Sequence, residues 1–294
     1  MFQNVTLAQA IQEAEKLLRN HGVPEPRLDA ELLLRHVLGR DRAWLLARLR
    51  ESLDEAVKER FDSVLERRAA REPIQYITGS QEFWGLDFAV TRDTLVPRPE
   101  TELIVETVLR DLGSSGKSGR QQTIIDLCSG SGCIAVSLAH ELPAARFFAT
   151  DASEAAIGMA RENARRHDVA GRIRFLTGDL FGPLQELDLA GRVDVIASNP
   201  PYIAAADRDA LQPEVRDFEP AMALFAGPEG TELHRRIIEG APEFLAPDGS
   251  LIMEMGIGQA EALSEMVRQS GAFGPPEIVK DLAGIDRLIV AKIK

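Results

Sequence analysis

Cysteine and histidine are scarce in this chain of 294 residues. Its two cysteines, Cys128 and Cys133, are too few for a disulfide framework or a cysteine-based zinc set. The five histidines are scattered and lack the spacing of metal ligands. We therefore expect no bound metal.

Long apolar runs are also missing. No stretch approaches the roughly 20 apolar residues of a membrane-spanning helix. The first residues are amphipathic and include acids, and they lack the basic start, apolar block and cleavage site of a secretory signal. We expect a cytoplasmic protein with no membrane partner. The hydrophobic fraction of 45% suffices for a full core in one large or two ordinary domains.

Positive charge is in deficit, with a formal net charge of −12. Residues 1–85 hold 13 basic and 14 acidic side chains, so the remaining residues carry a net charge of −11. A duplex-binding enzyme usually presents a basic face. The charge balance therefore argues against a direct nucleic-acid partner.

The first part of the chain, residues 1–75, has the pattern of a small helical bundle with short connections. Thr6, Asp41 and Asp54 precede amphipathic runs as helix caps, and Gly22 and Gly39 follow such runs as stops. The region carries no recognisable chemistry of its own.

The amino-acid composition changes near Pro73. The segment 74–98 is rich in aromatic and β-branched residues with Gly and Asp turns, which predicts a hairpin-like connector over residues 76–98. The second domain is expected over residues 99–294, beginning with a helix from Pro99 to about Leu112. A flexible loop is expected over residues 113–122.

Strand and helix patterns then alternate, which predicts an α/β fold with a mostly parallel sheet covered on both faces. Two final strands around Ala283-Gly284 would add an antiparallel edge strand. The expected strands are 123–128, 146–151, 173–177, 193–198 and 250–255, and the expected helices are 133–142, 153–167, 230–246 and 257–271.

The stretch TIIDLCSGSGCIA, residues 123–135, predicts a strand, a glycine turn and a helix. Gly130 and Gly132 would let the backbone approach a ligand closely, and Ala135 would allow close helix–strand packing. This pattern also fits a dinucleotide site. The alternative is a tight turn without a ligand.

Acids follow the next two strands. Asp151 lies about 20 residues after the glycines, where a carboxylate can accept hydrogen bonds from both ribose hydroxyls of a nucleoside. Its alternative role is a helix N-cap. Asp179 could accept a hydrogen bond from an adenine amine, with Leu180 or Phe181 covering the ring, or it could be an ordinary turn aspartate.

The tetrapeptide NPPY, residues 199–202, stands at the end of a buried strand. Pro200 forces Asn199 toward an extended conformation, so the amide of Asn199 projects from the carboxyl end of the sheet. The Asn199 amide and the Pro200 carbonyl could hold both hydrogens of a substrate NH2 group, with Tyr202 packed on the planar group. The alternative is a simple strand-ending turn.

Such an arrangement suits methyl transfer to a planar nitrogen. The lone pair of that nitrogen is delocalised, so holding both hydrogens aims it at an electrophile and favours pyramidalisation. S-adenosylmethionine brings its own electrophilic methyl group, and no metal or nucleophilic triad is needed. We therefore predict an amino-methyltransferase.

Over essentially its whole length the chain resembles the bacterial peptide chain release factor glutamine N5-methyltransferases. The similarity lies in the helical start, the glycine turn and the stretches "EPIQYITG", "EFWGLDF", "LVPRPETELIVE", "SNPPYI", "PEVRDFEPAMAL" and "DLAGIDR". "NPPY" alone is shared with adenine-N6 methyltransferases of DNA and RNA, whereas "PRPETE" together with "NPPY" is more specific.

The resemblance implies a class I S-adenosylmethionine-dependent methyltransferase domain, Rossmann-like, behind a helical substrate-binding domain. It implies methylation of the glutamine amide in the Gly-Gly-Gln loop of release factors. The implied cofactor-binding residues are Asp126, Cys128, Ser129, Gly130, Ser131, Gly132, Asp151, Asp179, Leu180 and Asn199. The implied substrate-binding residues are Asn199, Pro200, Pro201, Tyr202, Arg98 and Glu100, of which Asn199, Pro200 and Tyr202 are catalytic.

Some positions depart from the family or have two interpretations. Leu180 stands where the family often has an aromatic residue, and Cys128 stands where many relatives have glycine, which we interpret as packing. Arg98 and Glu100 could bind substrate or could serve ordinary helix initiation after Pro99. The segment 216–220 could line the substrate entrance or be only a loop.

Three rival functions remain at this point. An adenine-N6 methyltransferase acting on nucleic acid would share "NPPY". An NAD-dependent dehydrogenase would explain the glycine turn but gives "NPPY" no role, and a non-catalytic adaptor would not need the cofactor and amide motifs. The identity of the accepted release factors is open. We expect a monomer.

Overall fold

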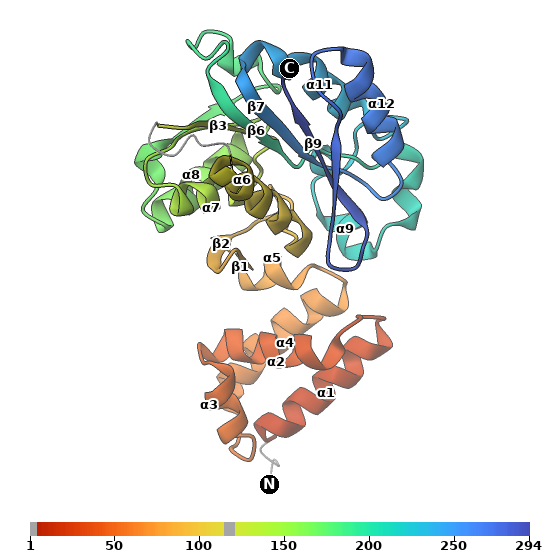
Figure 1. Ribbon diagram of the computed structural model, residues 1–294. Helices are drawn as coiled ribbons and strands as arrows, with labels where there is room; N and C mark the ends of the chain where they lie inside the picture. Colours follow the sequence, from red (N-terminus) through yellow and green to blue (C-terminus); the bar gives the residue numbers. More distant parts are fainter. Residues whose placement is uncertain (1–4, 115–120) are drawn as a thin grey trace. The chain divides into compact units, whose positions relative to one another are not determined.

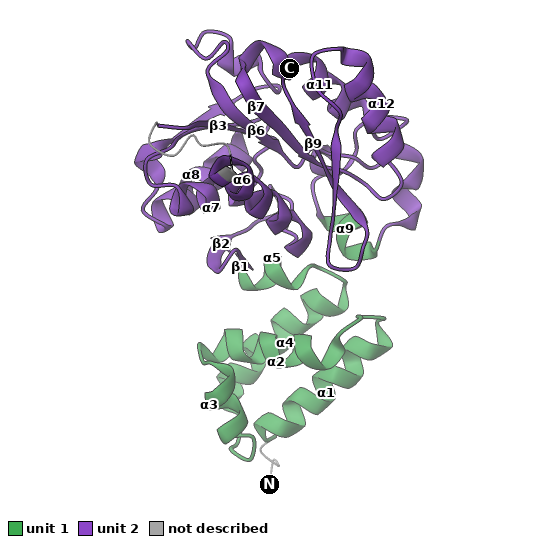
Figure 2. Cartoon of the chain, viewed as in Figure 1, with its two compact units in different colours: residues 1–79, 212–218 green, residues 80–211, 219–294 purple. Residues whose placement is uncertain are grey.

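The computed structural model describes residues 5–114 and 121–294. It comprises two compact units, residues 1–79 with 212–218 and residues 80–211 with 219–294 (Figure 2). The loop expected over 113–122 lies largely outside the described residues. No helix in the described parts is long and apolar enough to cross a membrane.

The first unit is helical, and its helices begin where the sequence places caps. Thr6 forms a capping box with Gln9, and the side chains of Asp41 and Asp54 accept hydrogen bonds from Trp44 N and Ala56 N. The expected caps are thereby confirmed. The helices are α1 (Leu7–Asn20), α2 (Pro26–Leu38), α3 (Arg42–Ala47), α4 (Glu55–Ala69) and α5 (Ile74–Thr78).

A sixth helix of this unit, α9 (Pro213–Phe218), comes from far along the chain. The buried Arg68 donates to Asp29 Oδ2 at 2.7 Å and to Glu214 Oε1 at 3.0 Å. Arg71 Nη2 also donates to Glu214 Oε2 at 2.6 Å. These ion pairs hold α9 in the helical unit. Because α9 ends at Phe218, most of the segment 216–220 is helix rather than loop.

The predicted hairpin-like connector is shorter than its expected range. Helix α5 continues to Thr78 and ends at Gly79, whose φ of 80° suits a left-handed C-cap. The hairpin consists of β1 (Ser80–Phe83) and β2 (Leu86–Ala89) only. The residues expected to begin the hairpin are helical because "IQYIT" completes one turn before its glycine stop.

The second unit is built on a seven-stranded sheet of order β5-β4-β3-β6-β7-β9-β8 (Figure 1). The pairs among β5, β4, β3, β6 and β7 are parallel, whereas β9 runs antiparallel to β7 and to β8. The strands are β3 (Thr123–Leu127), β4 (Arg146–Asp151), β5 (Ile173–Thr177), β6 (Val193–Ser198), β7 (Leu245–Glu254), β8 (Glu277–Lys280) and β9 (Asp286–Lys292).

Helices cover both faces of this sheet (Figure 1). Successive side chains of a strand point to opposite faces, so Ile124 and Ile125 belong to two separate hydrophobic clusters. One cluster includes residues of α6 (Glu102–Ser114), α7 (Cys133–Glu141) and α8 (Glu154–Arg166). The other includes residues of α11 (Glu232–Phe244) and α12 (Ala260–Ser270). The layered α/β fold is therefore confirmed.

The start of β7 differs from the expected range. The strand begins at Leu245, which pairs with Val193, and the register shifts before Ser250 pairs with Val195. Pro247-Asp248-Gly249 in between has the composition of a turn. A bulge in the strand therefore has the sequence pattern of a loop.

Candidate active site

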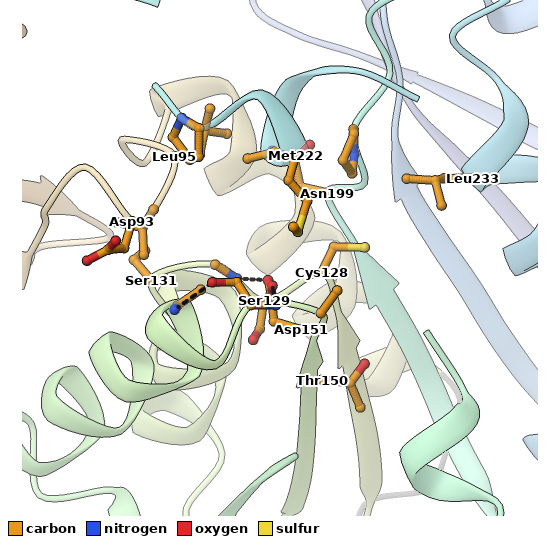
Figure 3. A pocket seen from close by; sticks show the side chains of 18 of the residues that line it. Asp93, Leu95, Cys128, Ser129, Ser131, Thr150, Asp151, Asn199, Met222 and Leu233 are labelled. Carbon is orange, nitrogen blue, oxygen red and sulfur yellow. Dashed lines mark hydrogen bonds between the residues drawn. The ribbon is translucent and has the colours of Figure 1, made fainter. Parts of the chain in front are cut away.

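A cavity of about 540 Å³ opens at the carboxyl ends of β3, β4 and β6 (Figure 3). Open α/β sheets bind ligands at this edge, and the volume lies in the range of cofactor sites. All residues that line the cavity belong to the second unit. Ten of the sequence-predicted site residues line it, namely Arg98, Cys128, Ser129, Gly130, Ser131, Asp151, Asp179, Leu180, Asn199 and Pro201.

The glycine turn connects β3 to α7 in a conformation that depends on left-handed backbone angles. Gly130 and Gly132 have φ of 53° and 80°. A Cβ on Gly132 would lie 2.9 Å from Ala160 Cβ, so a larger residue there would push against α8. Gly132 thus serves helix packing, whereas Gly130 lies at the cavity.

Cys128 adopts a φ of 58°, a region that L-residues rarely occupy. Burial raises the pKa of its thiol to about 12, so the thiol is neutral at physiological pH. A neutral thiol that lines the cavity agrees with the interpretation of Cys128 as a packing residue.

Asp151 lies at the end of β4 and faces the cavity (Figure 3). Its Oδ2 accepts a hydrogen bond from Gly130 N and its Oδ1 accepts one from Ser153 N, both at 2.9 Å. Ser153, and not Asp151, is the N-cap of α8, because Ser153 Oγ accepts from Ala156 N. Burial raises the pKa of Asp151, and the two backbone hydrogen bonds oppose this shift.

In the turn after β5, two neighbouring apolar residues have different surroundings. Leu180 lines the cavity, and its carbonyl accepts a hydrogen bond from Thr150 Oγ1 at 3.0 Å. Phe181 instead stacks on Phe244 in the core, with ring centroids 5.0 Å apart. Asp179 lines the cavity while its Oδ2 accepts from Arg236 Nη2. Leu180, rather than Phe181, is therefore the apolar side chain available to a bound ring.

The acid and the two serines near the end of β3 have different surroundings. Asp126 is fully buried, accepts from Ala135 N at 3.2 Å and does not line the cavity. Burial raises the pKa of Asp126 to about 8. Ser129 and Ser131 do line the cavity, and the buried Ser129 Oγ has no hydrogen-bond partner among the described residues. Ser129 Oγ is thus available to a ligand.

The NPPY segment divides between the cavity and the protein interior. Asn199 and Pro201 line the cavity, whereas Pro200 and Tyr202 are not among its lining residues. The Tyr202 hydroxyl donates to Glu254 Oε1 at 3.2 Å. This position differs from the stacking role that the sequence predicts for Tyr202.

Asn199 is connected to the same buried acid through a threonine. Its Nδ2 donates to Thr101 Oγ1 at 3.0 Å, and Thr101 Oγ1 donates to Glu254 Oε2 at 2.6 Å. Burial raises the pKa of Glu254, while the hydrogen bonds from Thr101 and Tyr202 oppose the shift. The amide oxygen of Asn199 is left as the acceptor that a ligand could use.

The "PRPETE" segment contributes residues of two kinds. Arg98 lines the cavity and its Nη2 donates to Glu219 Oε1 at 2.6 Å, with only 1% of the Glu219 side chain exposed. Glu100 is not among the lining residues and lies 3.7 Å from Arg287. Of the two residues predicted to bind substrate, the structure brings only Arg98 to the cavity.

Sequence reasoning missed Thr101, Glu254, Met222 and Arg236. Thr101 lies inside the "PRPETE" motif, directly after Glu100, and Glu254 is an acid at the end of an apolar strand. Both features could have indicated a site. Met222, which is 63% exposed, and Arg236 also line the cavity. Met222 lies in the quoted stretch "PEVRDFEPAMAL", but no role was assigned to it there.

Comparison with known proteins agrees with this geometry. The family model "PrmC N-terminal domain" matches residues 9–79, and "Methyltransferase small domain" matches residues 100–215. A release factor glutamine methyltransferase of Moorella thermoacetica is 44% identical over 98% of both chains. That of Geobacter sulfurreducens is 42% identical over 98% of this chain and 97% of its own.

This chain belongs to the release factor glutamine methyltransferase family. The resemblance inferred from the sequence motifs is therefore confirmed, together with the assignment as a methyltransferase. Among solved structures, the catalytic domain of human METTL16, crystallised with a MAT2A 3′UTR hairpin, has a TM-score of 0.57 at 18% identity. That match covers 77% of this chain and 81% of the other, and it supports the fold.

The cavity fits S-adenosylmethionine, the cofactor of this methyltransferase. Gly130 leaves room for close approach, because a Cβ there would meet no atom within 4 Å. The Asp151 carboxylate suits the ribose hydroxyls, and the unpartnered Ser129 Oγ offers a further polar contact. These residues are the ones that would hold the cofactor.

Proposed function

We propose that this enzyme methylates the side-chain amide nitrogen of the glutamine in the Gly-Gly-Gln motif of peptide chain release factors. The observation that carries the proposal is the orientation of Asn199. Its Nδ2 is bound to Thr101, so its Oδ1 is left to accept from a primary amide at the cavity. The names of the most similar relatives point to the same substrate.

The chemistry follows from the properties of an amide nitrogen. When bound, S-adenosylmethionine supplies the electrophilic methyl group. Asn199 Oδ1 would accept one N–H of the substrate amide at the cavity, and the carbonyl of the adjacent Pro200, assigned from the NPPY motif although Pro200 does not line the cavity in this structure, would accept the other and so fix the direction of the nitrogen lone pair. As the nitrogen gains positive character, both hydrogen bonds strengthen, which stabilises the transition state more than the bound substrate. Transfer of the methyl group to the nitrogen would break the methyl–sulfur bond and leave S-adenosylhomocysteine, and one N–H proton would pass to water, so the product would be a neutral N-methyl amide.

Neighbouring residues complete the proposed site. Arg98 would contact the substrate, with its guanidinium fixed by the buried Glu219. Asp151, Ser129 and Leu180 would bind the cofactor. Tyr202 would act through its hydrogen bond to Glu254 rather than by covering the substrate.

Selection of the substrate requires contacts beyond the cavity. Two carbonyl acceptors fit any primary amide, so they do not choose among proteins. We assign this selection to the helical region, residues 1–75, which contributes no residue to the cavity. We propose that the enzyme acts as a monomer and does not require nucleic acid.

Methylation of an adenine amine is the second candidate, because adenine also presents a planar NH2 group. The human METTL16 structure, solved with an RNA hairpin, has a similar fold. The net charge of −11 beyond residue 85 favours a protein substrate over a polyanion.

The test is incubation with labelled S-adenosylmethionine and either a purified release factor or RNA and DNA. We expect label in the release factor alone, and mass spectrometry should place a single methyl group on the glutamine of Gly-Gly-Gln. Label in nucleic acid, or methylation of another residue, would contradict the proposal.

A further inference from the structure

A continuous chain of hydrogen bonds runs from the Asn199 side chain into the protein interior. Asn199 Nδ2 contacts Thr101 Oγ1, which contacts Glu254 Oε2, and Glu254 Oε1 contacts the Tyr202 hydroxyl. Thr101 and Glu254 are each 2% exposed. Three segments far apart in the sequence therefore meet directly behind the proposed amide-binding residue.

Burial raises the pKa of Glu254, while the hydrogen bonds from Thr101 and Tyr202 and the positive charge of Arg287 favour its carboxylate form. With Glu254 as a carboxylate, which has no proton to donate, the donor and acceptor capacities along this chain allow one arrangement. Thr101 must then donate its single hydroxyl proton to Glu254. The Thr101 oxygen can only accept from Asn199, so the amide NH2 of Asn199 is directed inward and its oxygen faces the cavity.

An asparagine without these hydrogen-bond partners would have no preferred direction for its amide group. The two ends of its amide are almost the same size, and rotation by 180° would present an NH2 group to the substrate amide. Two NH2 groups cannot hydrogen-bond through their hydrogens, so the rotated form would not bind the reacting nitrogen. Orientation of Asn199 is therefore as necessary as its presence.

The other contacts of the network hold Glu254 and the NPPY backbone in place. The carbonyl of Glu254 accepts from His234 Nε2 at 2.8 Å, and the carbonyl of Tyr202 accepts from Gln259 Nε2 at 2.9 Å. The backbone at Glu254 and at Tyr202 is thus held by the side chains of His234 and Gln259. A largely buried chain of hydrogen bonds of this kind makes one side-chain orientation strongly preferred.

We propose that Thr101 and Glu254 are positioning residues for Asn199: together they select the amide rotamer that presents Asn199 Oδ1 to the substrate nitrogen. This inference rests on the proposed function, in which Asn199 holds the reacting amide. Thr101 and Glu254 need not touch the substrate, because they act through the direction of the Asn199 amide.

The test replaces the hydroxyl of Thr101 while keeping its shape. Thr101→Val is nearly isosteric but cannot accept from Asn199, so we expect kcat on a release factor to fall by about ten- to a hundredfold, as for other small misplacements at a reacting centre. Cofactor affinity measured by calorimetry should stay within about twofold, because no group assigned to the cofactor changes. Thr101→Ser keeps the hydroxyl and should restore kcat to near the parent value.

A second variant and a double substitution distinguish positioning from a structural effect. Thr101→Ala also removes the acceptor without adding bulk, and it should show the same loss of kcat. In an Asn199→Ala background, Thr101→Val should change single-turnover rates by less than about twofold, because the residue it orients is gone.

The outcomes separate this inference from the proposed function. Inactive Asn199→Ala with fully active Thr101→Val would overturn the inference alone. An equal loss from Thr101→Val in both backgrounds, or a loss that Thr101→Ser does not restore, would also overturn it. Full activity of Asn199→Ala would overturn the amide-binding role of Asn199 and this inference with it.

Discussion

Gly130 donates its backbone N–H to the carboxylate of Asp151 at 2.9 Å. The end of β4 is thereby joined to the glycine turn after β3, and the carboxylate is fixed at the cavity wall. A second hydrogen bond, from Ser153 N to the other carboxylate oxygen, prevents its rotation. The acid is therefore preorganised for a ligand, and its loss should affect binding more than folding.

We expect Asp151→Ala to weaken binding of S-adenosylmethionine by about one to two orders of magnitude, since a hydrogen bond to a charged group contributes roughly 1.5–3 kcal/mol. Isothermal titration calorimetry measures this change directly. Asp188→Ala is the control, because Asp188 is an exposed acid paired with Arg192 and does not line the cavity. Unchanged affinity for Asp151→Ala would remove this carboxylate from the cofactor site.

Asn199→Ala should lower kcat on a release factor by roughly two to three orders of magnitude, the range for loss of one polar group that stabilises a transition state. The melting temperature should change little, because Asn199 is only partly buried. Asn199→Asp tests the chemistry further, since it keeps an oxygen acceptor but cannot donate to Thr101. A near-parental rate for Asn199→Ala would contradict the proposed mechanism.

Much of the catalytic unit could be predicted from sequence because parallel strands have short, apolar patterns that end in turn residues. The carboxyl ends of β3, β4 and β6 meet at one edge, so Gly130, Asp151 and Asn199 were expected to lie together, and all three line the cavity. Periodicity determines which face of an element is buried. It does not determine which distant side chains meet across that interior.

The residues that sequence reasoning missed depend on such tertiary contacts. Thr101 and Glu254 are 153 positions apart, and only the packing of their segments brings them together. Helix α9 is six residues long and is held by ion pairs to Arg68 and Arg71, more than 140 positions away. A short helix with that kind of stabilisation has no periodic pattern of its own.

The buried Arg68 should be important for the stability of the helical unit. Its side chain is 6% exposed and pairs with Asp29 and Glu214, so Arg68→Met would leave those acids with fewer partners in the interior. Breaking a buried pair in this way costs about 3–5 kcal/mol. Chemical denaturation should show this loss. Arg19→Met, which removes an ion pair from a side chain that is 67% exposed, should change stability by less than about 1 kcal/mol.

The buried Asp126 should make the free energy of unfolding depend on pH. Burial raises its pKa in the folded protein from 3.8 to about 8, so the folded state binds this proton more tightly than the unfolded state does. The associated stabilisation is complete below pH 3.8 and is lost as pH rises to about 8. Relative to the parent, Asp126→Asn should therefore lose less stability between pH 4 and 8 in denaturation curves. Parallel curves would contradict the raised pKa.

The last prediction concerns how the substrate is selected. Asn199 Oδ1 and the Pro200 carbonyl are proposed to contact only the side-chain amide of the substrate. A short peptide containing Gly-Gly-Gln should therefore be a poor substrate compared with an intact release factor. Binding energy from remote contacts would be missing, so kcat/KM should fall by several orders of magnitude, largely through KM. A Gly-Gly-Asn peptide controls for amide position, because its shorter side chain should prevent methylation. The residual rate on the Gln peptide should still fall on Asn199→Ala substitution. Equal kcat/KM for peptide and intact factor would show that the cavity alone selects the substrate, and it would leave the helical region without the recognition role proposed for it.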